Sequence, residues 1–112
     1  MLRKLVFWGA AYKELIALPA IIQHRAGFLL KELQKGNDPP DWKPMPTVGA
    51  GVNELRIRDE SGAYRVIYIA RFEEAVYVLR CFEKKSQKTS QLDLQSAATR
   101  YRELVRRRSQ RG

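Results

Sequence analysis

Cysteine, histidine and long apolar runs are scarce in this sequence of 112 residues, and each scarcity excludes a class of protein. The single cysteine, Cys81, rules out an internal disulfide, and no Cys/His cluster has the spacing of a structural zinc site. No run of about 18 apolar residues could form a membrane-spanning helix. The apolar stretch that follows Arg3 and Lys4 is short and is interrupted at Lys13. We therefore expect a buried strand there instead of a secretory signal, and hence an intracellular, cytoplasmic protein.

The residues of most hydrolytic sites are missing as well. The only histidine, His24, falls in a predicted helix far from the basic C-terminal third, which disfavours Ser-His-Asp, Cys-His and Glu-His sites. Gly49-Ala50-Gly51 is not followed by a predicted helix, as a phosphate-binding loop would be. Cys81 lies inside a predicted strand and is expected in the core. Because the acids are scattered, the sequence predicts no metal site and no cofactor.

Positive charge, in contrast, is abundant and concentrated. Lys and Arg number 21 against 12 Asp and Glu, which gives a net charge of +9. Residues 80–112 hold ten of these cations against three acids, so the excess lies in the last third. Such a zone suggests a polyanionic partner: nucleic acid, an acidic protein or an anionic membrane surface. A basic face that serves only solubility is the simpler alternative.

The apolar spacing predicts an α+β fold in a single domain, residues 1–112, with a basic tail at about 106–112. Predicted strands cover 3–8, 52–58, 63–72 and 75–82, and predicted helices cover 10–18, 20–35 and 92–108. Residues 37–50 contain four of the five prolines and are expected to be loop. The order β-α-α-β-β-β-α predicts a small, mostly antiparallel sheet, with an N-terminal helical hairpin on one face and a C-terminal helix.

Cations lie on or beside the predicted strands. Arg56 and Arg58 alternate with Leu55 and Ile57, so they share the polar face of their strand, together with Glu54. Arg65 lies in a strand that is apolar on both faces. Since an unpaired buried charge is costly, we expect this part of the sheet face to be partly exposed. Lys84, Lys85 and Lys88 follow the last strand. Each cation alone is more often a solvated residue, but three separate segments can converge at one sheet edge.

Four segments together resemble a known family: Glu54-Leu55-Arg56, Gly62-Ala63-Tyr64-Arg65-Val66-Ile67-Tyr68, Phe82-Glu83-Lys84-Lys85-Ser86-Gln87-Lys88-Thr89 and Ala97-Ala98-Thr99-Arg100-Tyr101. They resemble the RelE/HigB superfamily, and within it the phage-derived HigB-like branch. The resemblance implies a RelE-like fold and the toxin of a bacterial type II toxin–antitoxin system. Such toxins are endoribonucleases, or mRNA interferases, that cleave messenger RNA in the ribosomal A site without a metal. A cognate antitoxin holds them inactive.

The resemblance also assigns residues. Arg65 matches the family's strand arginine, and Arg56 matches a basic position on the preceding strand. Lys84 or Lys85 matches the basic position after the last strand, and Lys88 matches the lysine-rich segment of the branch. Many RelE members carry a tyrosine near the start of the final helix, where this sequence has Leu92-Asp93-Leu94; Tyr101 is expected in the core instead.

Cations alone can support RNA cleavage. Attack of a 2′-hydroxyl on the adjacent phosphate gathers negative charge, which an arginine fork matches geometrically. A lysine crowded by other cations has a lowered pKa, so its neutral fraction can accept a proton. We therefore expect Arg65, Lys84 and Lys85 to be catalytic, and Arg56, Arg58 and Lys88 to bind RNA.

Two other functions remain open at this point. A ParE-like toxin would inhibit DNA gyrase with the same scaffold and no RNase activity, and a basic nucleic-acid-binding module would arrest nothing. Convergence of Arg65 with Lys84 and Lys85 on one open face would favour the RNase, because ParE-like action does not need it. The tail from Arg106 to Arg111 is expected to be a solvated helix end, with ribosomal RNA contacts as an addition.

Overall fold

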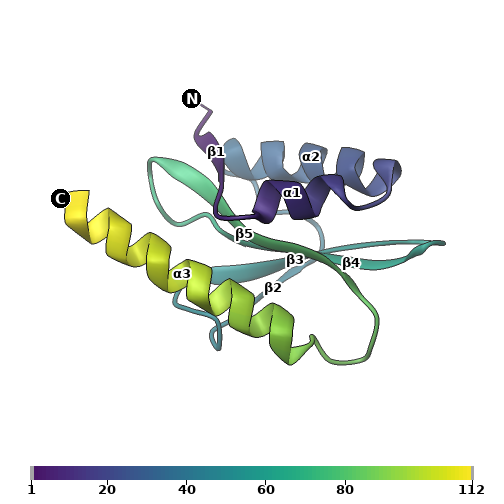
Figure 1. Ribbon diagram of the computed structural model, residues 1–112. Coiled ribbons are helices and arrows are strands. Elements are labelled where there is room, and N and C mark those ends of the chain that lie inside the picture. Colours follow the sequence, from purple (N-terminus) through teal and green to yellow (C-terminus); the bar gives the residue numbers. More distant parts are fainter. Residues whose placement is uncertain (1, 112) are drawn as a thin grey trace.

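The computed structural model describes residues 2–111 as one five-stranded sheet with helices on both of its faces (Figure 1). The elements are β1 (Lys4–Phe7), α1 (Ala11–Ile16), α2 (Ala20–Gln34), β2 (Trp42–Pro44), β3 (Val52–Asp59), β4 (Gly62–Ile69), β5 (Ala75–Lys84) and α3 (Gln91–Arg111). The strand order is β1-β5-β4-β3-β2. In this part of the chain β1 and β5 form the one parallel pair, so the predicted mostly antiparallel α+β fold is confirmed.

The sheet separates two apolar cores. The helical hairpin of α1 and α2 covers one face, and α3 covers the other (Figure 1). β4 and β5 lie in the middle of the sheet and contribute buried side chains to both cores, which explains why their sequences are apolar on both faces. Cys81 is one of these buried side chains, as predicted. Within residues 2–111 no helix combines the length and apolar character that crossing a bilayer requires.

A short strand inside the predicted loop corrects the expected element order. β2 pairs antiparallel with β3, with Trp42 opposite Leu55, and makes the order β-α-α-β-β-β-β-α. Three residues give too little alternation for a pattern to be visible. Pro44 ends the strand, and proline in a sheet is confined to edges such as this one.

The ends of β5 and α3 also differ from the prediction. β5 continues to Lys84, so this lysine belongs to the strand instead of following it. α3 continues to Arg111, and the predicted tail is therefore helix up to that residue, while Gly112 lies outside the described residues. Arg106 and Arg107 are exposed, as expected of a solvated helix end. Arg108 instead pairs with Glu74 in the turn before β5 and lies over the Phe72 ring.

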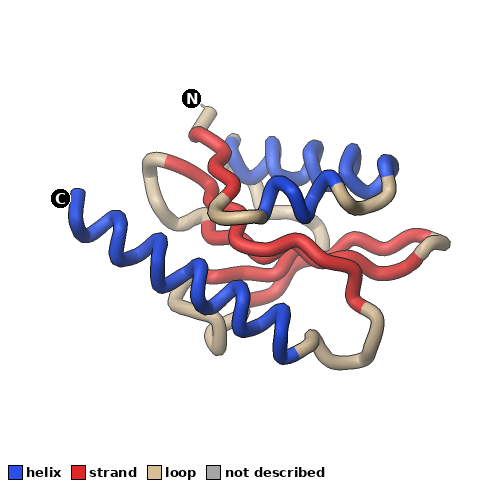
Figure 2. Tube along the Cα trace, in the orientation of Figure 1, coloured by secondary structure: helices blue, strands red, loops and turns tan. Residues whose placement is uncertain are grey.

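A partly buried ion-pair network ties α3 to the opposite side of the sheet. Glu14 on α1 accepts two hydrogen bonds of 2.8 Å from Arg100 on α3 and also pairs with Arg80 on β5. Arg80 in turn donates to Asp93 in the first turn of α3, at 2.7 and 3.0 Å. Ser90 caps this turn, because its hydroxyl accepts from the Asp93 backbone N–H. The network joins β5 to the first turn of α3. The loop that connects these two elements carries Lys85 and Lys88 (Figure 2).

Candidate active site

The predicted cations occupy the part of the sheet that α3 leaves uncovered. The β3–β4 hairpin extends past the N-terminal end of α3 (Figure 1). Arg58 lies opposite Ala63, and Ala63 lies opposite Lys84, so these three residues form one row across three strands. Arg56 and Arg65 form the next row. Because alternate residues of a strand share a face, the two rows are neighbours on the face that also carries α3.

These rows enclose an open pocket of about 420 Å³. Its lining residues are Arg58, Ala63, Arg65, Lys84, Lys85, Ser86 and Gln87. The small side chain of Ala63 in the middle of the first row leaves the space between Arg58 and Lys84. The structure thus brings together the three predicted catalytic residues and one of the predicted RNA-binding arginines. Arg65, Lys84 and Lys85 thus converge on one open pocket, as the sequence predicted for their position.

Arg65 lines this pocket but is far more buried than the sequence suggested. Only 4% of the residue is exposed, in contrast to the partly open position we expected. Its Nη1 donates to the Tyr64 carbonyl at 3.0 Å, while its Nε lies 3.5 Å from Glu54 and has no hydrogen-bond partner among the described residues. Burial lowers the pKa of Arg65, and Glu54 opposes that shift. The guanidinium is held in place with little freedom to move, which suits a group that must meet a developing charge.

Glu54 is the site residue that the sequence did not single out. It is 1% exposed and lies between Arg65 and Arg56, whose Nε is 3.3 Å from the same carboxylate oxygen. Thr89, in the loop before α3, donates to its other oxygen at 3.5 Å. The sequence placed Glu54 correctly on the face of Arg56 and Arg58. The missing information was that Thr89, in a distant loop, contacts the Glu54 carboxylate.

Arg56 and Lys88 lie on either flank of the pocket, outside its lining. Arg56 is one-third exposed and pairs with Glu54 and, at 3.8 Å, with Asp41. It lines a neighbouring pocket together with Arg58 and the exposed His24. Lys88 lines a smaller pocket of about 190 Å³ on the other side, which it shares with Lys84 and Lys85. The cationic surface is therefore continuous from Arg56 to Lys88, with the pocket at its centre.

Lys84 has a lowered pKa in this pocket. Burial lowers its pKa from the ordinary value of 10.5, and the positive charge of Arg65 lowers it further, against the opposing effect of Glu54. A larger neutral fraction at neutral pH follows directly from this shift. Lys84 lies at the end of a central strand, which fixes its Cα against Ala63.

Other candidate residues have no catalytic environment. Burial raises the pKa of the Cys81 thiol to about 12, so it is not a thiolate nucleophile. Tyr101 packs against the core below α3, as predicted, and lies against Gly49. Among residues 2–111 no three His, Cys, Asp or Glu side chains are grouped as metal ligands.

Comparison with known proteins shows what kind of protein has this fold. A double arginine-to-alanine variant of the E. coli toxin RelE in the free state matches with a TM-score of 0.66 and 19% identity, covering 90% of this chain and 98% of that one. The toxin–antitoxin complex RelBE2 of Mycobacterium tuberculosis matches with a TM-score of 0.54 and 24% identity, covering 75% of this chain and 100% of that one. The fold is thus that of the RelE-type toxins.

The family follows from the sequence match. Residues 13–102 match the family model described as phage derived protein Gp49-like (DUF891). This match covers most of the chain, which therefore belongs to the phage-derived Gp49-like family. The resemblance to RelE-type toxins that the sequence predicted is confirmed for the fold. None of the curated proteins compared with the chain matches it.

Proposed function

We propose that this protein is the toxin of a type II toxin–antitoxin system and that it cleaves messenger RNA during translation, as a metal-independent endoribonuclease in the cytoplasm. The observation that carries the proposal is the pocket in which Arg58, Arg65, Lys84 and Lys85 converge beside the buried carboxylate of Glu54. The RelE-type fold and the Gp49-like family support it. A surface that only bound nucleic acid would not need a buried, immobilised arginine or a lysine of lowered pKa.

The pocket suggests one role for each cation. Neutral Lys84 takes the proton of the 2′-hydroxyl as its oxygen attacks the adjacent phosphorus. The bond from phosphorus to the 5′-oxygen breaks, leaving a 2′,3′-cyclic phosphate and a 5′-oxygen that takes a proton from Lys85. Arg65 stabilises the charge that builds on the phosphoryl oxygens, and a single such contact is typically worth about 10²–10³-fold in rate. Arg58, Arg56 and Lys88 bind the neighbouring phosphates on both flanks.

An antitoxin partner is part of the same proposal. One of the structures that share this fold is a toxin–antitoxin complex. On the helical hairpin several large apolar side chains are exposed, among them Tyr12, Ile16, Ile21 and Phe28. Phe28 and Arg58 line one pocket, so a partner docked on the apolar hairpin would reach the cationic surface. We expect that partner to be apolar where it meets the helices and acidic where it covers the cations.

The test is expression from a tight inducible promoter, with messenger RNA ends mapped in translating cells. The wild type is expected to arrest growth and to produce new, in-frame cuts. Both effects should be lost in Arg65→Ala and in Lys84→Met. Since Arg65 is buried, its variant is checked for folding by circular dichroism. Lys84→Met removes one partly exposed ammonium, so it tests the pocket without disturbing the core. Arg102→Ala, on the exposed side of α3, is the matched control and should behave like the wild type.

Two results would contradict the proposal. Arrest with intact messages would indicate a protein target such as gyrase, and the cation pocket would then be a binding surface only. Cuts that persist in both folded variants would show that the pocket is not the active site.

A further inference from the structure

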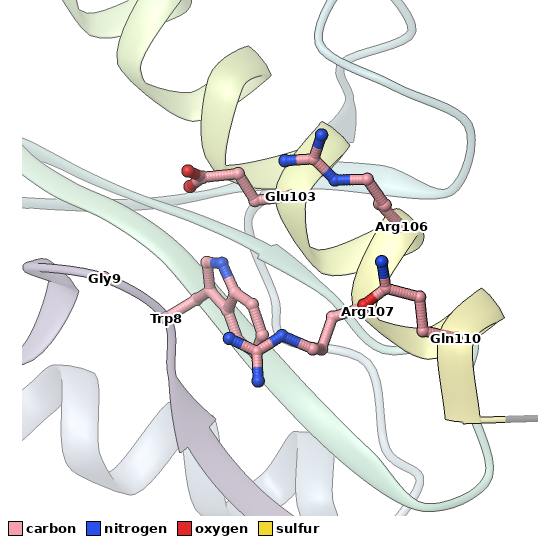
Figure 3. A pocket seen from close by; sticks show the side chains of 6 residues that line it. All are labelled: Trp8, Gly9, Glu103, Arg106, Arg107 and Gln110. Carbon is pink, nitrogen blue, oxygen red and sulfur yellow. The ribbon is translucent and has the colours of Figure 1, made fainter.

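A second pocket lies near the other end of α3, away from the candidate active site. It has a volume of about 530 Å³ and lies between the end of β1 and the C-terminal half of α3. Its lining residues are Trp8, Gly9, Glu103, Arg106, Arg107 and Gln110, and Figure 3 shows the α3 side chains and the Trp8 indole around it. From the first turn of α3 to Arg106 the helix rises about 22 Å, so the two pockets are separate sites. The volume is in the range of pockets that hold small molecules.

Trp8 is fixed in position at the wall of this pocket. Its backbone N–H donates to the Val78 carbonyl at 2.8 Å, and its ring meets Tyr77 edge to face, with centroids 6.2 Å apart. The indole is thus packed against the core on one side and lines the pocket on the other. Gly9, with φ +59°, turns the chain sharply just after it, and a Cβ there would lie 3.3 Å from the Arg100 side chain. An aromatic face held this way needs no reorganisation to receive a flat ligand.

Arg106 and Arg107 provide positive charge that the fold itself does not use. On α3, Arg100 pairs with Glu14, Arg108 pairs with Glu74, and Arg102 donates to Thr99. For Arg106 and Arg107, no ion pair or hydrogen bond is present among the described side chains. Figure 3 shows Arg107 reaching from the helix toward Trp8. The lining holds one acid, Glu103, so its net charge is positive.

We propose that this pocket binds one unpaired nucleotide of single-stranded RNA. The base stacks on the Trp8 indole, Arg106 and Arg107 bind the flanking phosphates, and the Gln110 amide contacts the edge of the base. An aromatic platform beside a pair of free arginines is the combination that binds single strands, because every base has a flat face and every nucleotide has a phosphate. The inference goes beyond cleavage and does not depend on it, since a strand could be held here whether or not the distant pocket cuts it.

The test uses a short single-stranded 2′-O-methyl RNA, which lacks the nucleophile for cleavage and therefore measures binding alone. Trp42→Phe removes the only other tryptophan, so intrinsic fluorescence then reports on Trp8. We expect the oligonucleotide to quench that fluorescence. By anisotropy of a labelled oligonucleotide, Trp8→Leu should weaken binding by about 5- to 140-fold, the usual range for one stacked base, and Trp8→Phe should weaken it less.

The arginines are tested through the salt dependence. Arg106→Gln/Arg107→Gln should reduce the slope of log K against log salt by about 1.4, as expected for two lost phosphate contacts on a single strand. The control Lys31→Gln/Arg102→Gln removes the same charge from exposed positions outside both pockets and should leave the slope unchanged. Both pairs lie on the surface, so neither outcome depends on a folding defect.

Three results would overturn the proposal. Equal affinity in the Trp8, Arg106/Arg107 and control variants would place RNA binding elsewhere. If an abasic oligonucleotide bound as tightly as the RNA and did not quench Trp8, no base would stack on the indole and the surface would bind phosphates only. Stronger quenching by an acidic peptide than by RNA would make the pocket a protein-binding site.

Discussion

Replacing Glu54 by Gln is the sharpest test of how the site is held together. The substitution keeps the shape of the side chain but removes the negative charge that pairs with Arg65 and is buried together with it. Removing one partner of a buried pair typically destabilises a protein by about 3–5 kcal/mol, because the other charge is left buried and unpaired. The long contact of 3.5 Å to Arg65 favours the lower end of that range. Arg56 is one-third exposed and adds at most about 1 kcal/mol.

We therefore expect Glu54→Gln to lower the free energy of unfolding by about 3 kcal/mol. Since domains of this size are stable by about 5–15 kcal/mol, the variant should remain folded. Urea unfolding followed by tryptophan fluorescence measures the free energy of unfolding of both proteins. The slope of this free energy against urea concentration should be unchanged, which shows that the same surface is exposed on unfolding. Glu60→Gln, in the exposed β3–β4 turn, is the matched control and should stay within about 0.5 kcal/mol of the wild type.

A double variant tests whether the loss of stability in Glu54→Gln comes from the unpaired charge of Arg65 or from another effect of the substitution. If the loss comes from the stranded charge of Arg65, then Arg65→Met in the Glu54→Gln background should recover stability, because no unpaired buried charge is left. A Glu54→Gln protein as stable as the wild type would refute the reasoning. So would a double variant whose loss is the sum of the two single losses.

Three further predictions follow from individual contacts. Because the pKa of Lys84 is lowered, the cleavage rate on purified translating ribosomes should rise with pH above 7, with a slope of log rate near one; a flat profile would identify a different base. Gly49→Ala should destabilise the fold by about 1–3 kcal/mol, because the new Cβ would lie 2.4 Å from the Tyr101 ring; Tyr101→Leu should recover part of the loss, and no recovery would exclude this clash. Arg108 lowers the pKa of Glu74 to about 2 from 4.5, so this carboxylate stabilises the fold above pH 4.5 and the effect is lost as the pH falls toward 2. The free energy of unfolding of the wild type should exceed that of Glu74→Gln by about 0.5–1 kcal/mol at pH 7, and this difference should shrink as the pH is lowered. A difference that does not change with pH would contradict the pairing.

Most of the fold could be predicted from the sequence because its signals are local. Alternation in β3 and the helical spacing of Leu94, Ala97, Tyr101 and Leu104 in α3 are set by which side chains face a core. β2 could not be found this way, since it is three exposed residues long and depends on β3 as its partner.

The site was predicted less completely, for a related reason. The identity of its cations could be inferred, because Arg65, Lys84 and Lys85 lie in segments that resemble a known family. The environment of Glu54 includes Thr89, which comes 35 residues later in the chain and donates a hydrogen bond to its carboxylate. No local pattern carries that information.

The position of β5 in the sheet also determines when the site can exist during synthesis. Among residues 2–111, β5 is the last strand to be made, yet it lies between β1 and β4, and β1 pairs there with no other strand. Until residues 75–84 have emerged, β1 has no partner, both cores are incomplete and Lys84 is absent from the row of Arg58 and Ala63. The pocket is therefore among the last parts of this sheet to form during synthesis, because it cannot exist before β5 is in place between β1 and β4.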